Sequence, residues 1–330
     1  MRRIAFPLAV LFIAVLAFVH VPGEPAAHGG VLLVTNKSEN TLSFIDTETG
    51  EELERIATGP GPHEVATTPD GRLAFVANYG SNSLTVVDVV KREALGMIDL
   101  GEHTRPHGVV VTKDGSSVWV TTEGSQDLVE VDVELRTVKR SIKTGQQVTH
   151  MVALAESKGK AYTANIGSDN VTAIDIERGE VIKQIATGAG AEGIAVTIDD
   201  RYVLVTNREA GTLSVIDVST DEVVHDMEVG GFPIRVEVTP DGKHALVSQA
   251  TAQTLLEIEI GSWAVKRKLE VGAMPVGVEI RPDGKVAYVA NTRDDMLTAV
   301  DLEKFDALMT MKGGDEPDGM AYVTLGAHSH

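Results

Sequence analysis

Cysteine is absent from all 330 residues of the sequence. The chain therefore has no disulfides, no thiol nucleophile, no thiolate metal ligands and no lipidated cysteine, and its stability must come from packing. Aromatic residues make up only 4% of the chain. Few flat side chains are thus available as a platform on which nucleic-acid bases could stack.

Positive charge is also scarce. The sequence has 29 lysines and arginines against 48 aspartates and glutamates, which gives a formal net charge of −19. Proteins that bind nucleic acid neutralise phosphates with lysine and arginine, and anionic membranes attract basic segments. The charge balance therefore argues against both partners. Hydrophobic residues, at 43%, are nevertheless ample for a packed core.

Only one long apolar run is present, and it lies at the N-terminus. Arg2 and Arg3 precede the apolar residues 4–19, and the small residues Ala26 and Ala27 follow. This order is typical of a signal peptide, which we place at residues 1–27, and it predicts a periplasmic or secreted protein. An uncleaved membrane anchor is the alternative. No other segment approaches spanning length, so we expect no membrane span after removal of the signal.

What the sequence does have is repetition. Stretches of the form xVxN recur every 42 to 44 residues, and an aspartate and a glycine recur with them. The asparagine column contains Asn36, Asn78, Thr122, Asn165, Asn207, Gln249 and Asn291. A fixed period of this length indicates stacked structural repeats, and seven units fill the chain from about residue 31 to its end. We expect the aspartate and asparagine columns to bond the backbone of local turns.

Each unit has the pattern of four short antiparallel strands. Segments such as AFVAN and LTVVDV are rich in strand-forming residues, PDGR-type turns separate them, and no unit contains a useful amphipathic helix. These features predict an all-β, seven-bladed propeller that forms a single domain over residues 28–330. The chain starts in mid-unit and ends with PDGMAYVTL. We therefore expect residues 318–325 to complete the blade begun by residues 31–57 and so close the ring.

The repeated phrases resemble those of the YVTN-repeat (YncE-like) beta-propellers. The resemblance rests on VLLVTN…TLSFIDTETGEE, VLVTN…TLSVIDVSTDEV, AYVAN…LTAVDLEKFDA and VTPDGKHALV, and it covers nearly the whole chain after the signal. It implies a seven-bladed propeller, often one found outside the cytoplasm. Related propellers include lactonases, lyases, cofactor-binding domains and binding modules, so the resemblance implies a fold and leaves the activity open.

One column differs between units in a way that a repeated scaffold does not explain. It precedes the first strand of each unit and contains His63, His107, His150, Glu192, Ile234, Val276 and Asp318. Because the first strand of a blade lines the central channel, the first four residues should form an arc at one mouth, with aliphatic residues opposite. The neighbours that could contact a ligand are Glu64, Arg105 and Arg235. The other histidines of the propeller body, His103, His225 and His244, are expected at the surface.

The leading hypothesis is a metal-dependent binding site for a small molecule. Neutral imidazoles and a carboxylate suit zinc, iron, manganese, copper or nickel. His63, His107, His150 and Glu192 would hold the divalent metal, and water or the small-molecule ligand would take an open position. The alternative for the same residues is that they bond neighbouring loops and water at a polar pore.

Two further hypotheses need no metal. A lactonase, isomerase or lyase could use a histidine of the arc as general base, oriented by Glu64 or Glu192, with Arg105 or Arg235 holding an anionic group. A protein-interaction scaffold would instead use the rim of the propeller. For all of these hypotheses we expect a monomer.

Overall fold

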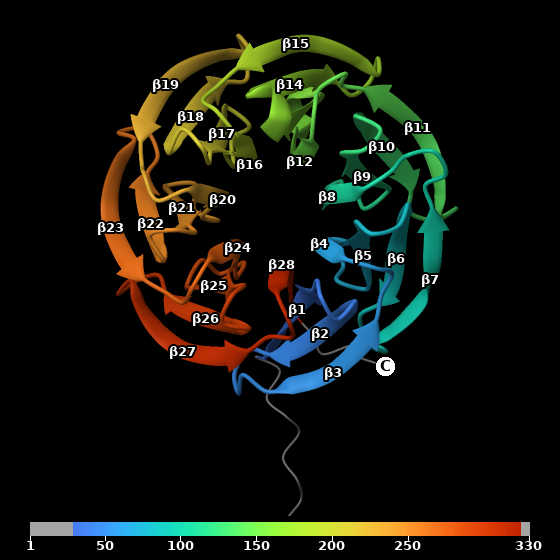
Figure 1. Ribbon diagram of the computed structural model, residues 1–330, viewed down its shortest axis with the longest axis vertical. Coiled ribbons are helices and arrows are strands. Elements are labelled where there is room, and N and C mark those ends of the chain that lie inside the picture. Colours follow the sequence, from blue (N-terminus) through green and yellow to red (C-terminus); the bar gives the residue numbers. More distant parts are fainter. Residues whose placement is uncertain (1–28, 325–330) are drawn as a thin grey trace, which may run out of the picture.

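The computed structural model describes residues 29–324. The signal peptide predicted at residues 1–27 lies outside the described residues. Seven four-stranded antiparallel sheets form a ring around a central channel (Figure 1), which confirms the predicted all-β, seven-bladed propeller. The described residues contain two helices, both short 3-10 turns, η1 (Glu156–Lys158) and η2 (Ile166–Ser168). Neither of these two helices within residues 29–324 is long and apolar enough to cross a membrane.

In six blades the chain runs outward from the channel, strand by strand. The innermost strands are β4 (Pro62–Thr67), β8 (Pro106–Val111), β12 (Thr149–Ala155), β16 (Ala191–Val196), β20 (Pro233–Val238), β24 (Pro275–Ile280) and β28 (Pro317–Thr324). The second strands are β1 (Gly30–Asn36), β5 (Leu73–Asn78), β9 (Ser117–Thr122), β13 (Lys160–Asn165), β17 (Tyr202–Asn207), β21 (His244–Gln249) and β25 (Val286–Asn291).

The third and outermost strands complete each blade. The third strands are β2 (Thr41–Asp46), β6 (Ser83–Asp88), β10 (Asp127–Asp132), β14 (Asn170–Asp175), β18 (Thr212–Asp217), β22 (Thr254–Glu259) and β26 (Met296–Asp301). The outermost strands are β3 (Glu52–Ala57), β7 (Glu93–Asp99), β11 (Thr137–Lys143), β15 (Glu180–Ala186), β19 (Glu222–Glu228), β23 (Ala264–Glu270) and β27 (Asp306–Lys312).

The seventh blade joins the two ends of the described chain. Strand β28 is its innermost strand and pairs antiparallel with β1, with Val31 opposite Val323 and Leu33 opposite Ala321. This arrangement confirms the closure expected from the split repeat. Strands β28 and β1 thereby form backbone hydrogen bonds between the two ends of the described chain, and the ring has no open blade edge at the junction.

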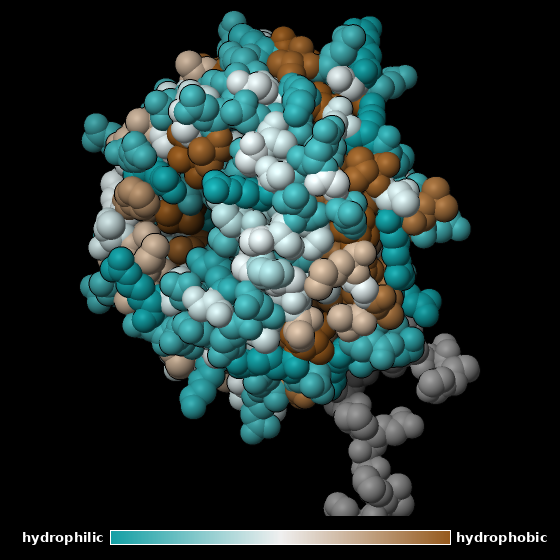
Figure 2. Space-filling model, turned by 45° about the vertical axis from the view of Figure 1, so that its right-hand side comes forward, coloured by the Kyte–Doolittle hydropathy of each residue, from teal (hydrophilic) through white to brown (hydrophobic). Residues whose placement is uncertain are grey.

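The hydrophobic core lies between neighbouring blades. Every residue of β9 is buried, whereas β3 has no buried residue. Middle strands are covered on both faces by adjacent blades, so they read as continuous apolar runs. Trp119, Tyr162 and Phe75 fill these spaces and are at most 1% exposed. Hydrophilic residues cover most of the face seen in Figure 2, where the apolar patches are separate from one another.

The two repeated polar columns have different roles. Asp46 follows the predicted turn chemistry, because its Oδ1 accepts the backbone amides of Glu48 and Thr49 at 2.9 and 2.8 Å. The asparagine column does not fit the prediction of a local turn. Asn78 is fully buried, and its amide donates to the hydroxyls of Ser83 and Thr85 on the next strand, both at 3.0 Å. These side-chain bonds tie the second strand of the blade to the third.

His103 lies in the interior, contrary to the expectation of a surface position. Its side chain is 9% exposed, and Nδ1 lies 2.8 Å from Oδ2 of the buried Asp127. The Nζ of Lys143 approaches Oδ1 of the same carboxylate at 2.9 Å. A buried carboxylate needs such partners to offset the loss of its hydration. His103 is therefore a structural residue of its blade.

Candidate functional site at the channel mouth

A β-bulge at the start of the innermost strands brings the candidate residues to one mouth of the channel. In β4 the pairing with β5 holds at Pro62 and resumes at Val65, so His63 and Glu64 stand outside the ladder. Strands β8, β16, β20 and β24 have the same irregularity. A bulge re-aims the side chains at a strand end. Its repetition explains why equivalent residues of successive blades meet at this mouth.

A cavity of about 210 Å³ occupies the mouth. The candidate metal ligands His63, His107, His150 and Glu192 line this cavity. The ligand-contact candidates Glu64 and Arg235 line it as well, and so do the aliphatic residues expected opposite, Ile234 and Val276. Residues from at least five blades therefore share one small cavity. Arg105 is the exception among the candidates.

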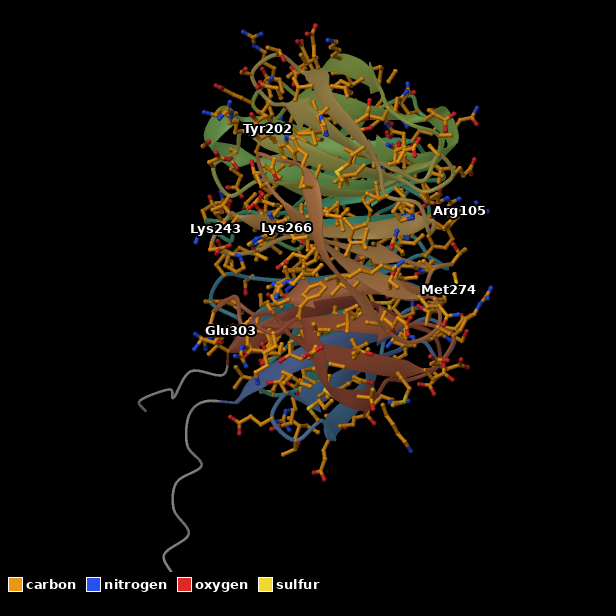
Figure 3. The ribbon with its side chains drawn as sticks, turned by 90° about the vertical axis from the view of Figure 1, so that its left-hand side faces the viewer. Arg105, Tyr202, Lys243, Lys266, Met274 and Glu303 are labelled. Atoms are coloured by element: carbon orange, nitrogen blue, oxygen red, sulfur yellow. The ribbon has the colours of Figure 1, made fainter. Side chains whose placement is uncertain are left out.

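Arg105 lies at the rim, outside the lining of the cavity. Its side chain is exposed, and its guanidinium carbon is 5.8 Å from the ring centre of Tyr79. Figure 3 shows Arg105 at the edge of the same face as Met274, and the labelled Lys243 and Glu303 lie toward the opposite face. The backbone of Arg105 has a φ of 56°. This left-handed residue ends the loop that enters β8.

Three imidazole rings lie in contact along one wall of the cavity. The ring centroids of His63 and His107 are 4.8 Å apart, and those of His107 and His150 are 3.7 Å apart. Tyr79 packs against His63 with a centroid distance of 4.8 Å. Positively charged rings at such distances would repel one another strongly. Metal ions bind imidazole in its neutral form.

His107 is the most deeply placed of the three rings. The residue is 5% exposed, and its Nδ1 is buried with no hydrogen-bond partner among the described residues. Burial, together with the nearby rings of His150 and His63, holds the pKa of His107 well below its ordinary value. This imidazole is consequently neutral at neutral pH. A buried nitrogen without a partner loses the free energy of a hydrogen bond, unless something else occupies its lone pair.

Glu123 is a site residue that the spacing argument did not identify. It follows β9, and its Oε1 accepts the Nδ1–H of His150 at 2.5 Å while Oε2 accepts the hydroxyl of Tyr79 at 2.8 Å. Although burial favours the neutral acid, the hydrogen bond from His150 lowers the pKa of Glu123 below its ordinary value. The carboxylate is thus ionised and fixed at both oxygens.

A second variable column would have revealed Glu123. The residue directly after each xVxN stretch differs from blade to blade: Lys37, Tyr79, Glu123, Ile166, Arg208, Ala250 and Thr292. In the structure Lys37 and Arg208 line the cavity, and Tyr79 and Glu123 contact its histidines. Four blades therefore contribute a second residue to the mouth, located directly after the second strand, in addition to the one at the start of the innermost strand.

Glu192 is held by a cation rather than by the histidines alone. Its Oε2 accepts Nη1 of Arg208 at 3.0 Å, and its Oε1 lies 3.7 Å from Nε2 of His150. On another side of the cavity, Nζ of Lys37 lies 3.3 Å from Oδ2 of Asp318. His150 therefore stands between two carboxylates, Glu123 at one ring nitrogen and Glu192 at the other.

Glu64 and Arg235 form an ion pair at the floor of the mouth cavity. Both residues are 7% exposed, Nη2 of Arg235 donates to Oε1 of Glu64, and Nη1 lies 3.4 Å from Sδ of Met151. Burial by itself would lower the pKa of Arg235, but the negative charge of Glu64 raises it above the ordinary value. Each partner of this ion pair therefore neutralises the charge of the other.

The same ion pair also borders a second cavity of about 410 Å³. Aliphatic residues of the innermost strands form most of its wall, and its charged lining residues are Glu64, Arg235, Glu237 and Glu279. Burial raises the pKa of Glu237 to about 7 and that of Glu279 to about 8. Among residues 29–324, Arg235 is the only cation that lines this cavity.

Three residues at the mouth could hold a metal ion, and they differ in part from the predicted set. Ligand atoms of His107, Glu123 and His150 all lie within 4.8 Å of one another. Ligands at about 2.1 Å from one tetrahedral ion lie roughly 3.4 Å apart, so the side chains would have to close on the ion by up to about 1.4 Å. Glu123 therefore replaces Glu192 in the set of candidate ligands, because the ion pair with Arg208 holds Glu192 beside the other ring nitrogen of His150.

Solved structures show where this architecture recurs. A chain of the Kuenenia stuttgartiensis hydrazine synthase matches with a TM-score of 0.72 and 20% identity, over 79% of this chain and 89% of that one. A functionally unknown protein from Desulfotomaculum acetoxidans matches with a TM-score of 0.79 and 13% identity, over 89% and 98%. The dihydro-heme d1 dehydrogenase NirN, in complex with DHE, matches with a TM-score of 0.61 and 16% identity, over 88% and 74%. At these identities the likeness establishes the fold alone.

The comparison of sequences identifies a family, whereas the comparison of structures establishes the fold alone. No curated protein matches the sequence. The profile of YNCE-like beta-propellers matches residues 99–281, which is more than half of the 330 residues. Together with the seven closed blades, this match confirms the resemblance seen in the repeated phrases: the chain belongs to the YNCE-like beta-propeller family.

Proposed function

We propose that the protein binds a divalent transition metal at the channel mouth and a small molecule beside it. His107, His150 and Glu123 would be the protein ligands, and the ligand molecule or water would complete the coordination. The observation that carries the proposal is the buried, unpartnered Nδ1 of His107 within a stack of imidazoles. A metal ion supplies the partner that this nitrogen lacks.

The surroundings of His150 support this ligand set. Metal-bound histidines usually donate their second ring N–H to a carboxylate, which fixes the tautomer and the ring orientation. If His150 gives up its Nδ1 proton to bind the metal beside Glu123, its Nε2–H can donate to Glu192, 3.7 Å away. Arg208 already holds Glu192 in that position. In this arrangement Glu192 is a positioning residue, and His63 packs against His107 at the edge of the site.

Metal binding should depend on His107. We expect His107→Ala to lower the affinity for zinc by roughly 100-fold or more, because it removes a ligand, whereas loss of an outer partner costs about 10- to 100-fold. The zinc affinity of Glu192→Gln should therefore lie between that of the wild type and that of His107→Ala. Isothermal titration of chelator-treated protein with zinc measures these affinities, and elemental analysis gives the stoichiometry.

His225→Ala is the matched control, because His225 lies on the outermost strand β19 and contacts Trp263, with a centroid distance of 6.3 Å. It should bind zinc like the wild type. Equal affinities for the wild type and His107→Ala, or less than one zinc ion per chain in the wild type at saturation, would contradict the proposal.

The hydrogen bond between Glu123 and His150 also favours a second candidate, a metal-free enzyme of the lactonase, isomerase or lyase type. A carboxylate that accepts Nδ1–H orients an imidazole as a general base, with Nε2 available for the substrate. Turnover of a panel of lactones and hydroxy acids in the presence of a chelator distinguishes the candidates. Metal-free catalysis that is lost in Glu123→Gln would favour the enzyme over the binding protein.

The amino-terminal pattern supports export, so the proposed site would operate in the periplasm or outside the cell. The acidic surface and the shortage of lysine and arginine support a small-molecule ligand over nucleic acid. Amino-terminal sequencing of the mature protein tests the location: a first residue near His28 supports export with cleavage, and an intact N-terminus contradicts it.

A further inference from the structure

An apolar wall faces the histidines across the mouth cavity. Phe232, Ile234, Met274 and Val276 line the cavity from β20, β24 and the loops that enter these strands. Figure 1 shows β20 and β24 across the channel from β4, β8 and β12, the strands that carry the histidines. The site therefore has two unlike halves, one able to bind a metal ion and one suited to hydrocarbon.

Two residues of this wall have a backbone conformation that disfavours their side chains. Phe232 and Met274 both have a φ of 55°, and the equivalent residues of two other blades are glycines, Gly61 and Gly190, with φ values of 59° and 74°. A left-handed conformation costs a residue with a Cβ roughly 1–2 kcal/mol. The equivalent residues Arg105, Val148 and Glu316 have φ values of 56°, 55° and 55°, so the conformation belongs to the repeated blade. What distinguishes Phe232 and Met274 is that they place large apolar side chains at this position, next to the cavity.

Phe232 also connects the wall to the polar half of the site. The guanidinium carbon of Arg208 lies 5.6 Å from the ring centre of Phe232, and the same guanidinium holds Glu192. Phe232 and Met274 are only partly buried, although they pack against the core beneath them. Their remaining exposed surface is therefore available to a bound molecule.

The charges at the mouth indicate the charge of that molecule. The cations of the lining are paired one to one with carboxylates, as Lys37–Asp318, Arg208–Glu192 and Arg235–Glu64. Imidazoles bind a metal ion in their neutral form, so Glu123 and a divalent ion would give a net charge of +1 at the metal. A site with this balance favours a ligand that contributes one negative charge.

We infer that the ligand is a small organic monoanion whose donor group binds the metal and whose alkyl or aryl body packs on Phe232 and Met274. This inference rests on the proposed metal site. The cavity volume of about 210 Å³ limits the ligand to a small one, because pockets for drug-sized molecules have roughly 300–1,000 Å³. A carboxylate or hydroxamate with one ring or a short chain fits this description.

The experiment compares benzohydroxamate with acetohydroxamate on the zinc-loaded protein. Both probes have the same anionic chelating group, and only benzohydroxamate has a ring to place on the apolar wall. Burial of a ring contributes about 1.5–3 kcal/mol, so benzohydroxamate should bind the wild type at least tenfold more tightly. Phe232→Gly, measured on zinc-saturated protein, should reduce this preference to about threefold or less.

Arg105→Gly is the matched control variant. It introduces glycine at the equivalent left-handed position of another blade, outside the cavity lining, so the preference between the two probes should stay as in the wild type. Circular dichroism melts establish whether both variants are folded. If Phe232→Gly does not fold, Met274→Gly provides a second test of the apolar wall.

The possible failures are distinguishable. Zinc binding with no preference for benzohydroxamate, or with a preference that persists in both Phe232→Gly and Met274→Gly, overturns the inference and leaves the metal site standing. Failure to bind zinc overturns the metal site and the inference with it.

Discussion

Replacement of Arg235 by methionine is expected to lower the free energy of unfolding by about 3–5 kcal/mol at pH 8, because it leaves a buried carboxylate without its partner. Glu64 loses the guanidinium that now bonds it, and Glu237 and Glu279 lose the cation that lines their cavity with them. The cost should be smaller at pH 5, where these carboxyls can take up protons instead of remaining charged. Urea denaturation at the two pH values measures both differences.

Two further variants make this test specific. Arg281→Met removes a cation that pairs with Asp283 at the surface, where an ion pair contributes only about 0–1 kcal/mol. The double variant Glu64→Met/Arg235→Met removes both members of the ion pair, and it should recover the part of the loss that comes from the unpaired Glu64. The account is contradicted if Arg235→Met costs no more than Arg281→Met at either pH.

Replacement of Glu279 by glutamine is expected to stabilise the protein by about 2–4 kcal/mol at pH 8.5 and to have little effect at pH 4.5. Burial and the charge of Glu237 raise the pKa of Glu279 to about 8, well above the value of an unfolded glutamate. The folded state therefore binds this proton more tightly than the unfolded state does. Stability from this group is complete at low pH and is lost as the pH rises from about 4.5 to about 8.

The geometry allows glutamine to replace Glu279 without loss of its hydrogen bond. Oε1 of Glu279 accepts the backbone amide of Tyr322 at 3.0 Å, and the amide oxygen of glutamine can do the same. The control is Glu303→Gln, at an exposed position on the surface (Figure 3), which should change the unfolding free energy little at either pH. A Glu279→Gln variant that is no more stable than the wild type at pH 8.5 would show that Glu279 titrates as an exposed carboxyl does.

The sequence was sufficient to predict the blades and the closure of the ring. The period of 42 to 44 residues and the turns recur in seven units, so a pattern that is weak in one unit is recognised from the others. The split unit at the two ends then indicates how the ring closes. The same argument brought His63, His107, His150 and Glu192 to one mouth, because equivalent positions of a propeller are equivalent in space.

The contacts within the site could not be predicted in the same way, because they join blades far apart in the sequence. Glu64 and Arg235 are 171 residues apart and meet across the channel. Glu192 turns to Arg208 in its own blade, which leaves Glu123 as the carboxylate beside the imidazoles. Such choices depend on side-chain directions that the repeat does not specify.

The sequence does contain a signal for the two glutamates of the second cavity. Three residues after the histidine column the units contain Ala66, Val110, Ala153, Ala195, Glu237, Glu279 and Ala321. Two glutamates in an otherwise aliphatic column of the innermost strands indicate buried carboxyls inside the channel. Comparison of every column between the units, beyond those with histidine, would have predicted this acidic pair along with Glu123.

Crystals of the chelator-treated protein soaked in zinc, with diffraction recorded above and below the zinc absorption edge, test the central claim most directly. The account predicts an anomalous difference peak in the mouth cavity, within ligating distance of His107, His150 and Glu123, that is absent from crystals of His107→Ala. Anomalous peaks confined to surface carboxylates, with none beside His107 in the wild type, would contradict it.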